Sequence, residues 1–271
     1  MYREILQGYG IEFSGAVPFS VCRVFDEDII TRRGIALSEI KSAILFLVPY
    51  YFNDGVDGNI SVYARAHDYH IFFEKLYSDI VPRLEKAYNA RFWGFADKSA
   101  IGEVGAASCA GLGAIGDNGL IINEKYGSFV FIGEILSDVE PEMLGCSADV
   151  KYEPSFCTHC GACRNACPMK EGQGCLSFVT QKKGELTQEE EALILKYGYA
   201  WGCDICAAVC PFTKKAVAAG NITPIEFFKN DRIAFLTLDA VEAMDKQTFK
   251  NRAFSWRGKK TIIRNLELFE K

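Results

Sequence analysis

Eight of the chain's 11 cysteines fall into two linked groups, and this grouping restricts the fold more than any other feature. The first group is the run Cys157-Thr-His-Cys160-Gly-Ala-Cys163-Arg-Asn-Ala-Cys167-Pro168. The second is split: Cys175 stands alone, and Cys203-Asp-Ile-Cys206-Ala-Ala-Val-Cys210-Pro211 completes it. Such short spacings let successive thiolates turn around one metal centre, and the proline after the last cysteine of each run redirects the chain.

The spacing C-x₂-C-x₂-C-x₃-C-P is that of two-cluster ferredoxins, in which the fourth cysteine of each run binds the other cluster. The sequence therefore predicts two 4Fe–4S clusters with crossed ligands. One set is Cys157, Cys160, Cys163 and Cys210, and the other is Cys167, Cys175, Cys203 and Cys206. Zinc and disulfides are the alternatives, but zinc sites usually show paired C-x₂-C motifs without crossed C-x₃-C-P endings.

Size and composition are those of a soluble globular protein. The 271 residues suit one large or two modest domains, with 49% hydrophobic and 24% charged residues. We expect no membrane span, because no stretch approaches the roughly 18 apolar residues required. The N-terminus lacks the apolar core of a signal peptide, and iron–sulfur thiolates need a reducing compartment, so we expect a cytoplasmic protein.

Charge is distributed unevenly. The formal net charge of −5 does not suggest a general nucleic-acid binder. Residues 246–271, here called the C-terminal tail, hold eight basic residues and two acids, so the tail is +6 and the remainder −11. A solvated helix face is the ordinary explanation of such a run, and an anionic partner is the alternative. Because the tail is the only evident basic segment, we expect any RNA binding to be lost on truncation after Asp245.

Residues 1–150 combine strand and helix patterns. Short apolar runs predict strands at 43–50 and 91–97. Two more strands flank residues 123–127 and suggest a strand–turn–strand unit. Apolar residues at helical spacing predict an amphipathic helix over 68–88.

Helical signals dominate the rest of the chain. Thr187, three residues before Glu190, predicts the start of a helix inside the second cysteine group. Thr223-Pro224 predicts another helix, with proline at its first position, and two short helices after it. These patterns predict an α/β domain at 1–150, a double-cluster domain at 151–215 and a helical tail at 216–271.

Two further features are candidates for chemistry. Asp97 stands where a predicted strand ends, a place from which side chains enter pockets; a turn or helix N-cap is the alternative, because Asp is a favoured cap. The glycine-rich stretch 110–119 permits close backbone approach to a ligand. It lacks the strand and helix that a dinucleotide-binding fingerprint requires around it, so nicotinamide binding is weakly supported.

The remaining cysteines and the histidine between the ligands receive plainer interpretations. Cys22, Cys109 and Cys146 have no ligand spacing and are predicted to be buried thiols. His159 lies inside the first cysteine run, where we expect it to pack or to tune a cluster rather than to bind metal.

The order of these pieces resembles the epoxyqueuosine reductase family. The resemblance rests on these segments: Asp68-Tyr-His70, Asp97, Gly-Leu-Gly-x₂-Gly-x-Asn118, Tyr126-Gly-Ser-Phe-Val-Phe-Ile-Gly-Glu134, both cysteine groups with Cys175-Leu-Ser177 and Trp201-Gly-Cys203-Asp204, and the closing Arg257-Gly-x₆-Arg264-Asn265. That family deoxygenates an epoxide on a tRNA wobble base with a cobalamin and two 4Fe–4S clusters. The resemblance implies a nitroreductase-like corrinoid-binding α/β domain, a two-cluster ferredoxin-like module and a short helical tail.

The resemblance also implies roles for single residues. It makes Asp97 the proton donor to the substrate. It also places Asp97 and six other residues near the corrinoid. Those residues are Ser61, Ile121, Ile132, Ser177, Cys203 and Asp204, many of them through backbone atoms. It further implies a low-potential electron donor of the ferredoxin or flavodoxin type.

The chain departs from the family pattern at three places. It stops where family members continue into a helical-repeat module that grips tRNA. Asp117 stands where the family has lysine, and Arg65-Ala-His67 replaces a Trp-Gly-containing segment. We therefore expect an epoxyqueuosine reductase-like enzyme, and two alternatives stay open: an electron carrier that binds no corrinoid, and a corrinoid reductase of a small molecule.

Overall fold

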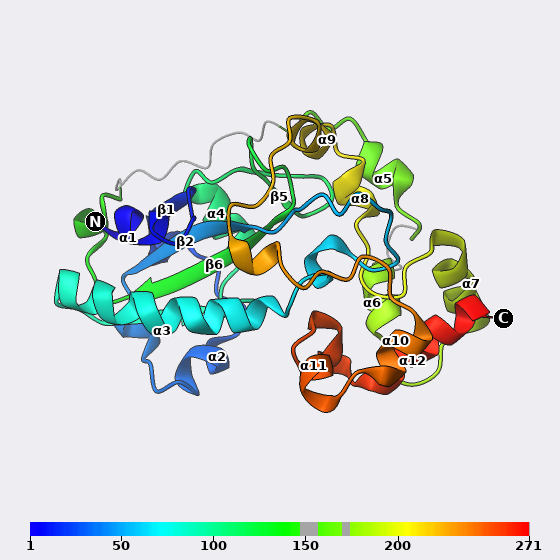
Figure 1. Cartoon of the computed structure of the whole chain (residues 1–271). Coiled ribbons are helices and arrows are strands. Elements are labelled where there is room, and N and C mark those ends of the chain that lie inside the picture. The colour runs from blue at the N-terminus through cyan, green and yellow to red at the C-terminus, as the bar shows by residue number, and fades with distance from the viewer. Residues whose placement is uncertain (147–156, 170–173, 271) are drawn as a thin grey trace.

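The computed structural model of the chain describes residues 1–146, 157–169 and 174–270. Its strands all lie in the first of these ranges, and Figure 1 shows them in one half of the molecule. They are β1 (Ser14–Pro18), β2 (Ser42–Pro49), β3 (Phe92–Phe95), β4 (Ala114–Ile115), β5 (Ile121–Ile122) and β6 (Val130–Ser137). Four form an antiparallel sheet in the order β1-β2-β6-β3, and β4 pairs with β5. The mixed helix and sheet class predicted for this region is confirmed.

Helices cover both faces of the four-stranded sheet. They are α1 (Tyr2–Gln7), α2 (Glu27–Thr31), α3 (Tyr69–Tyr88) and α4 (Glu103–Cys109). All eight residues of β2 are buried, because alternate side chains enter different cores. Leu45 and Leu47 pack in the core that contains α4, whereas Phe46 and Val48 pack in the core that contains α3. The continuous apolar run at β2 therefore marks a central strand of the sheet, buried on both faces.

Helix α3 confirms the longest predicted element. The Asp68 carboxylate caps it by accepting a hydrogen bond from the backbone N–H of His70, and Asn89 ends it in the left-handed conformation. Its apolar face, predicted from helical spacing, is buried at Phe73, Leu76 and two further positions. The first residue of the helix, Tyr69, lies close to the end of β3, since its hydroxyl reaches Asp97.

The predicted strand–turn–strand unit around 123–127 is only partly right. Both strands exist, but β5 pairs with β4 and β6 joins the large sheet. The Asn123 side chain accepts from the backbone N–H groups of Lys125 and Tyr126 and donates to the Leu112 carbonyl. This buried side chain therefore directs the chain from one sheet to the other.

The described residues from 157 onward contain helices and no strands. They are α5 (Ala162–Ala166), α6 (Leu176–Gln181), α7 (Gln188–Tyr197), α8 (Ile205–Ala208), α9 (Pro211–Ala218), α10 (Leu238–Ala243), α11 (Lys246–Lys250) and α12 (Lys259–Glu267). The capping box of Thr187 and Glu190 starts α7, as predicted. The predicted boundary between the first two domains, at 150–151, lies outside the described residues.

The helix predicted at Thr223-Pro224 is wrong. Only a single 3₁₀ turn forms, at Glu226–Phe228. Thr223 is fully buried and its N–H donates to the Tyr51 carbonyl, while its hydroxyl accepts from Ile225. These tertiary bonds hold the segment extended. The described residues beyond this segment contain three short α-helices, α10 to α12, rather than the two predicted.

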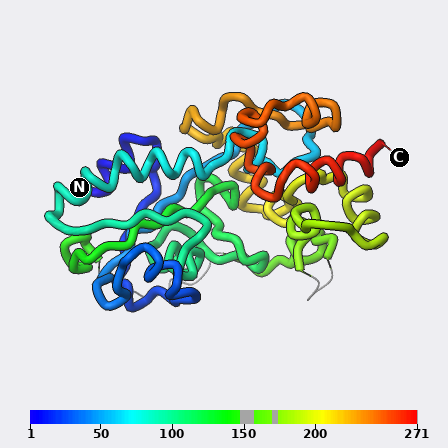
Figure 2. Tube along the Cα trace, turned by 90° about the horizontal axis from the view of Figure 1, so that it is seen from below, coloured from blue at the N-terminus to red at the C-terminus, as the bar shows by residue number. Residues whose placement is uncertain are grey.

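The C-terminal tail is built into the molecule. Phe254, Ile262 and Leu266 share a core with Ile60 and Trp201. Figure 2 shows the red C-terminal helix beside the yellow-green segment of α6 and α7, and the two ends of the chain lie at opposite ends of the molecule. Among the described residues, no helix is long and apolar enough to cross a membrane.

Several tail cations serve this packing. Arg252 is buried and donates to the Asp231 carbonyl. Lys259 donates to two carbonyls at the C-terminal end of α10, and Arg264 donates to the Lys182 carbonyl. Three of the tail's eight cations are therefore structural, whereas Lys246, Lys250 and Lys260 are exposed.

Candidate functional site

The four cysteines predicted to hold the first cluster line one small pocket. Cys157, Cys160 and Cys163 reach it from α5 and the loop before α5, and Cys210 reaches it from the N-terminus of α9. His159 has a left-handed backbone (φ 51°), which turns the loop between the first two cysteines. Cysteines from both runs therefore meet at one point, as crossed ligation requires.

The other four cysteines are also neighbours. Burial raises the pKa of the Cys206 thiol, and the nearby Cys175 and Cys167 act in the same direction. Burial also raises the pKa of Cys203 to about 12, with Cys175 and Cys206 close to it. Thiols with such raised pKa values ionise readily only beside a cation, and the iron of a cluster is one.

All 11 cysteines lie in the described part of the chain and carry free thiols, which contradicts the disulfide alternative. Cys22, Cys109 and Cys146 are half-buried rather than buried as predicted. Cys22 and Cys109 lie at the margin of the core around α4, where packing covers only one side of each thiol.

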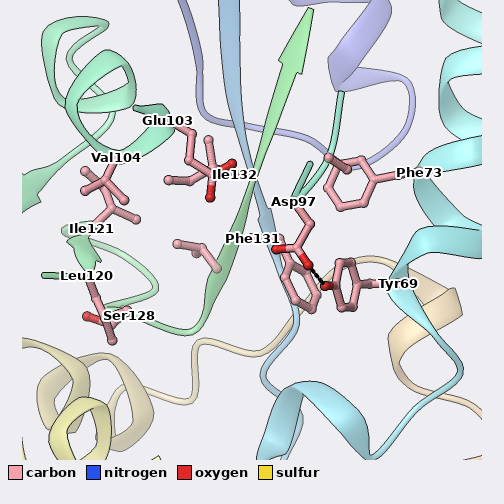
Figure 3. A pocket seen from close by; sticks show the side chains of 12 residues that line it. Tyr69, Phe73, Asp97, Glu103, Val104, Leu120, Ile121, Ser128, Phe131 and Ile132 are labelled. Atoms are coloured by element: carbon pink, nitrogen blue, oxygen red, sulfur yellow. Dashed lines mark hydrogen bonds between the residues drawn. The ribbon is translucent and has the colours of Figure 1, made fainter. Parts of the chain in front are cut away.

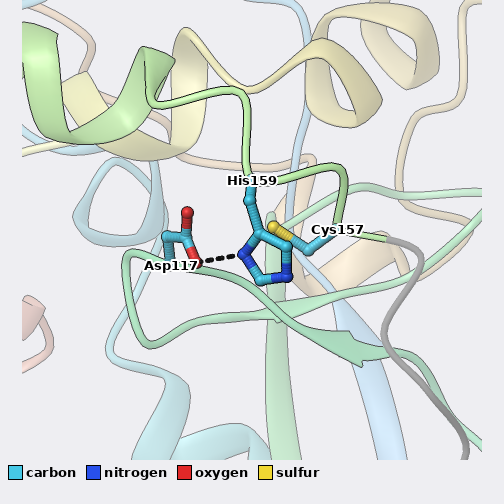
Figure 4. A group of neighbouring side chains, drawn as sticks. All are labelled: Asp117, Cys157 and His159. Atoms are coloured by element: carbon cyan, nitrogen blue, oxygen red, sulfur yellow. Dashed lines mark hydrogen bonds and ion pairs between the residues drawn. The ribbon is translucent and has the colours of Figure 1, made fainter.

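Asp117 and His159 form a polar contact next to the first cysteine set (Figure 4). The Asp117 Oδ1 atom lies 2.7 Å from Nδ1 of His159, and both groups lie within 4.8 Å of the Cys157 ligand atom. His159 is 69% exposed and Asp117 only 16%. Asp117 therefore takes the place of the family's lysine with a partner from the ligand loop, whereas the expectation that His159 packs is wrong, because its side chain is mostly exposed.

A second pocket, of about 130 Å³, lies between β6, α4 and the start of α3 (Figure 3). Asp97 stands at its rim, two residues after β3. Its walls are mainly apolar. They include Phe73, Val104, Leu120, Ile121, Val130, Phe131 and Ile132.

Asp97 points at Tyr69 across this rim. Its backbone is left-handed (φ 63°), a conformation that Asp tolerates, and its carboxylate accepts a short hydrogen bond from the Tyr69 hydroxyl. The helix-cap alternative is wrong, because α4 begins six residues later with Gly102 as its N-cap. The turn alternative is confirmed, since the Lys98 N–H donates to the Ala96 carbonyl and places Asp97 at the centre of a tight turn. The Asp97 side chain is 58% exposed, so it is open to a ligand from outside.

Residues of the first turn of α3 hold this arrangement. The Tyr69 ring stacks on Phe131 at 4.4 Å and on His70 at 4.3 Å between ring centroids. His70 Nδ1 lies 2.8 Å from Asp68, and this hydrogen bond raises the pKa of His70. His70 Nε2 lies 3.8 Å from the Asp97 carboxylate. A hydroxyl and an imidazole therefore both face Asp97.

Two more carboxyl groups belong to this region, and neither was predicted from the sequence: Glu103 lines the pocket (Figure 3), and Glu134 is buried in β6. Burial raises the pKa of Glu103 to about 7, and the charge of Asp97 adds to the shift. Burial raises the pKa of Glu134 to about 8, although Ser99 donates a 2.5 Å hydrogen bond to it. An acid within the apolar run 128–136 was the available signal for Glu134. Both groups can hold protons near neutral pH.

The residues that the resemblance placed near a corrinoid fall into two groups. Ile121 and Ile132 line the same pocket as Asp97. Ser61 and Asp204 lie elsewhere, buried, with a 2.5 Å hydrogen bond from Ser61 Oγ to the Asp204 carboxylate.

The second group extends to Ser177 and Cys203. Ser177 Oγ accepts a hydrogen bond from Gln181, and Cys203 belongs to the second cysteine set. Tyr63 lies between the two groups. Burial raises its pKa, and Asp204 and Asp97 are both close enough to contribute. The side chains of Ser61, Ser177 and Asp204 are therefore engaged with protein partners, and so are the backbone N–H and carbonyl of Ser61.

Comparison with known proteins finds relatives of both the cysteine region and the chain as a whole. The 4Fe–4S dicluster domain family matches residues 156–214. The epoxyqueuosine reductase of Lactococcus garvieae is 32% identical over 221 residues, which cover 77% of this chain and 60% of that protein. The epoxyqueuosine reductase of Leadbetterella byssophila is 30% identical over 223 residues, covering 77% of this chain and 69% of that protein.

A solved structure shares the fold across nearly the whole chain. It is a crystal structure of an epoxyqueuosine reductase with an epoxyqueuosine-modified stem loop of tRNA-Tyr. The TM-score is 0.77 at 24% identity, and the match covers 98% of this chain and 79% of the other. The chain is thus shorter than these proteins, and it spans 60% of the length of the Lactococcus relative.

Proposed function

Because this chain belongs to the epoxyqueuosine reductase family, we propose that it removes the oxygen of an epoxide on a tRNA nucleoside. The observation that carries the proposal is the Asp97–Tyr69 pair at the rim of an apolar pocket, in a molecule that also gathers two sets of four cysteines. A relative of the same fold has been crystallised with an epoxyqueuosine-modified stem loop, which supports the choice of substrate.

The chemistry requires electrons and protons in equal number. Loss of the epoxide oxygen as water, with formation of a carbon–carbon double bond, consumes two electrons and two protons. We assign the electrons to two 4Fe–4S clusters held by the crossed cysteine sets, since such clusters transfer single electrons at low potential. A ferredoxin or flavodoxin type of donor would reduce them.

The first proton comes from the rim of the pocket. Asp97 gives it to the departing oxygen, solvent gives the second once that oxygen has left the ring, and the Tyr69 hydroxyl holds the carboxyl group in place. His70 lies 3.8 Å from Asp97, and its raised pKa suits it to return a proton between turnovers. The apolar walls keep water from the reacting carbon atoms.

A corrinoid is several times larger than this pocket of about 130 Å³, so the pocket would border only the part of the ligand that faces the substrate, and its chemistry fits that contact. Its walls are apolar, and the hydroxyl of Ser128 faces it buried and with no hydrogen-bond partner in the described part of the chain. Ile121, Ile132 and Ser128 would hold that part of the corrinoid, and the resemblance places the remainder near Ser61 and Cys203. When bound, cobalamin supplies a cobalt centre that accepts and donates single electrons, which no side chain does. We also propose that residues 1–150 form a nitroreductase-like corrinoid-binding domain.

A single-turnover experiment tests this proposal. Protein loaded anaerobically with both clusters and cobalamin is reduced, freed of excess reductant and mixed with an epoxyqueuosine-modified anticodon stem loop. We expect the visible absorbance of oxidised clusters to return as queuosine forms. Clusters that stay reduced would contradict the proposal. Absence of any spectral change on adding cobalamin would instead favour the electron-carrier alternative.

A further inference from the structure

A cation-lined groove lies next to the Asp97 pocket. Its volume is about 470 Å³, and it is bounded by the end of α2, the first turns of α3 and the segment from β3 to Lys98. Phe73 and Ala96 line both the groove and the pocket, and His70 in the groove faces Asp97 in the pocket. A ligand whose reacting group enters the pocket would therefore extend into this groove.

Positive charge predominates along the groove. Arg32, Arg33 and Lys98 line it, and Glu74 is the one acid among its lining residues. All three cations are exposed. In the described part of the chain, the Lys98 side chain has no hydrogen-bond or ion-pair partner. Arg32 pairs only with Asp28, at 3.2 Å and with both side chains more than 70% exposed, so that pair is weak and readily exchanged.

Arg33 is held in place and still has donors to spare. Its guanidinium lies over the Phe95 ring at 4.3 Å, and one terminal nitrogen donates to the Gly94 carbonyl at 2.7 Å. The remaining N–H groups have no acceptor among the described residues. A guanidinium fixed in this way presents a planar pair of donors, which matches the oxygens of a phosphate group.

We infer that this groove binds the phosphate backbone of the RNA strand whose modified nucleoside enters the Asp97 pocket. The inference rests on the proposed function and replaces the expectation that the C-terminal tail grips the RNA. Three of the tail's cations, Arg252, Lys259 and Arg264, are already bonded to backbone carbonyls. The groove cations keep donors for a ligand, and they adjoin the site of reaction.

The test removes charge from the groove without disturbing Arg33. The double variant Arg32→Gln/Lys98→Gln is compared with a matched control from the tail, Lys246→Gln/Lys260→Gln, whose two lysine side chains are exposed and make no hydrogen bond within the described residues. Affinity for the epoxyqueuosine-modified anticodon stem loop is measured as a function of salt. Melting temperature and cluster absorbance check that each variant is folded and loaded.

Two phosphate contacts contribute about 1.4 to the slope of log affinity against log salt, or roughly 25-fold in affinity at about 0.1 M salt. We expect the groove variant to lose this slope and about this affinity, and the control to keep both. Equal losses in the two variants, or none in the groove variant, would overturn the inference and leave the RNA substrate standing. If the wild-type protein binds no RNA at low salt, the substrate assignment fails together with the groove.

Discussion

At the scale of single residues, the candidate site depends on a few side chains around Asp97. Its left-handed backbone turns the carboxylate toward Tyr69 instead of along the strand axis. The sequence placed Asp97 at the end of a strand, but it could not show that the first turn of α3 would supply the partner. That meeting depends on the pairing of β3 with β6 and the packing of α3 on the sheet.

We predict that Asp97→Asn lowers turnover by about 10²–10⁴-fold, the usual contribution of general acid catalysis. Asparagine keeps the size of the side chain and still accepts from Tyr69, but it has no proton to give. Single-turnover kinetics measure the loss. Cluster absorbance and melting temperature should match the wild type, and activity within a few-fold of the wild type would remove Asp97 from the mechanism.

Glu134 should make stability depend on pH. Its folded-state pKa, about 8, exceeds its ordinary value of 4.5, so the folded chain binds a proton that the unfolded chain releases. The contribution of this proton to the free energy of unfolding is fully present below pH 4.5 and is lost as pH rises through 8. Each pKa unit is worth about 1.4 kcal/mol, so the change amounts to several kcal/mol.

The melting temperature of the wild type is therefore expected to fall between pH 5 and pH 8, and the variant Glu134→Gln should flatten that fall. Glu124→Gln, which removes an exposed carboxyl group, is the control and should leave the fall unchanged. If Glu134→Gln retains the full dependence on pH, Glu134 is ionised in the folded protein.

At the scale of elements, local signals predicted α3 and α7, because their caps and apolar faces are written within each segment. The segment at Thr223 carried an equally good local signal and is extended, because a hydrogen bond to the Tyr51 carbonyl prevails. Likewise, no local signal shows that β5 pairs with β4 and not with β6, as the predicted strand–turn–strand unit had it. Contacts between distant segments decide such cases, and one sequence does not contain them in readable form.

The crossing of the two cysteine runs is a prediction at this scale. Cys210→Ser should remove the cluster of the first run, and Cys167→Ser the cluster of the second. In each case iron should fall from about eight to about four atoms per chain. Cys22→Ser, which changes a thiol outside both sets, should leave iron unchanged. Electron paramagnetic resonance of the reduced protein identifies the lost cluster, and loss of the cluster of the variant's own run would refute the crossing.

At the scale of the whole molecule, the C-terminal tail packs on Ile60 and Trp201, and its helix α12 contacts α6, which follows Cys175. Truncation after Asp245 should therefore destroy the fold, not only RNA binding. It removes Phe254 and Ile262, both fully buried, and loss of one such side chain typically costs about 2–5 kcal/mol. A truncated protein with the wild-type melting temperature would contradict this account of the tail.

The cation-lined groove could not be predicted from the sequence, since Arg32 and Arg33 are far from Lys98 along the chain and the three form no charge run. The division into domains at 1–150, 151–215 and 216–271 stays a prediction. The cysteine pattern, by contrast, indicates a local chemistry from the sequence alone, because ligand spacing is a property of the chain itself.

The most direct test of the central claim is product formation. Protein shown to hold both clusters is incubated anaerobically with epoxyqueuosine-containing tRNA, cobalamin and a low-potential reductant, and the nucleosides are then measured by mass spectrometry. We predict conversion of epoxyqueuosine to queuosine that requires cobalamin and is lost in Asp97→Asn. No conversion by protein that holds both clusters and cobalamin would contradict the claim and point to a smaller substrate.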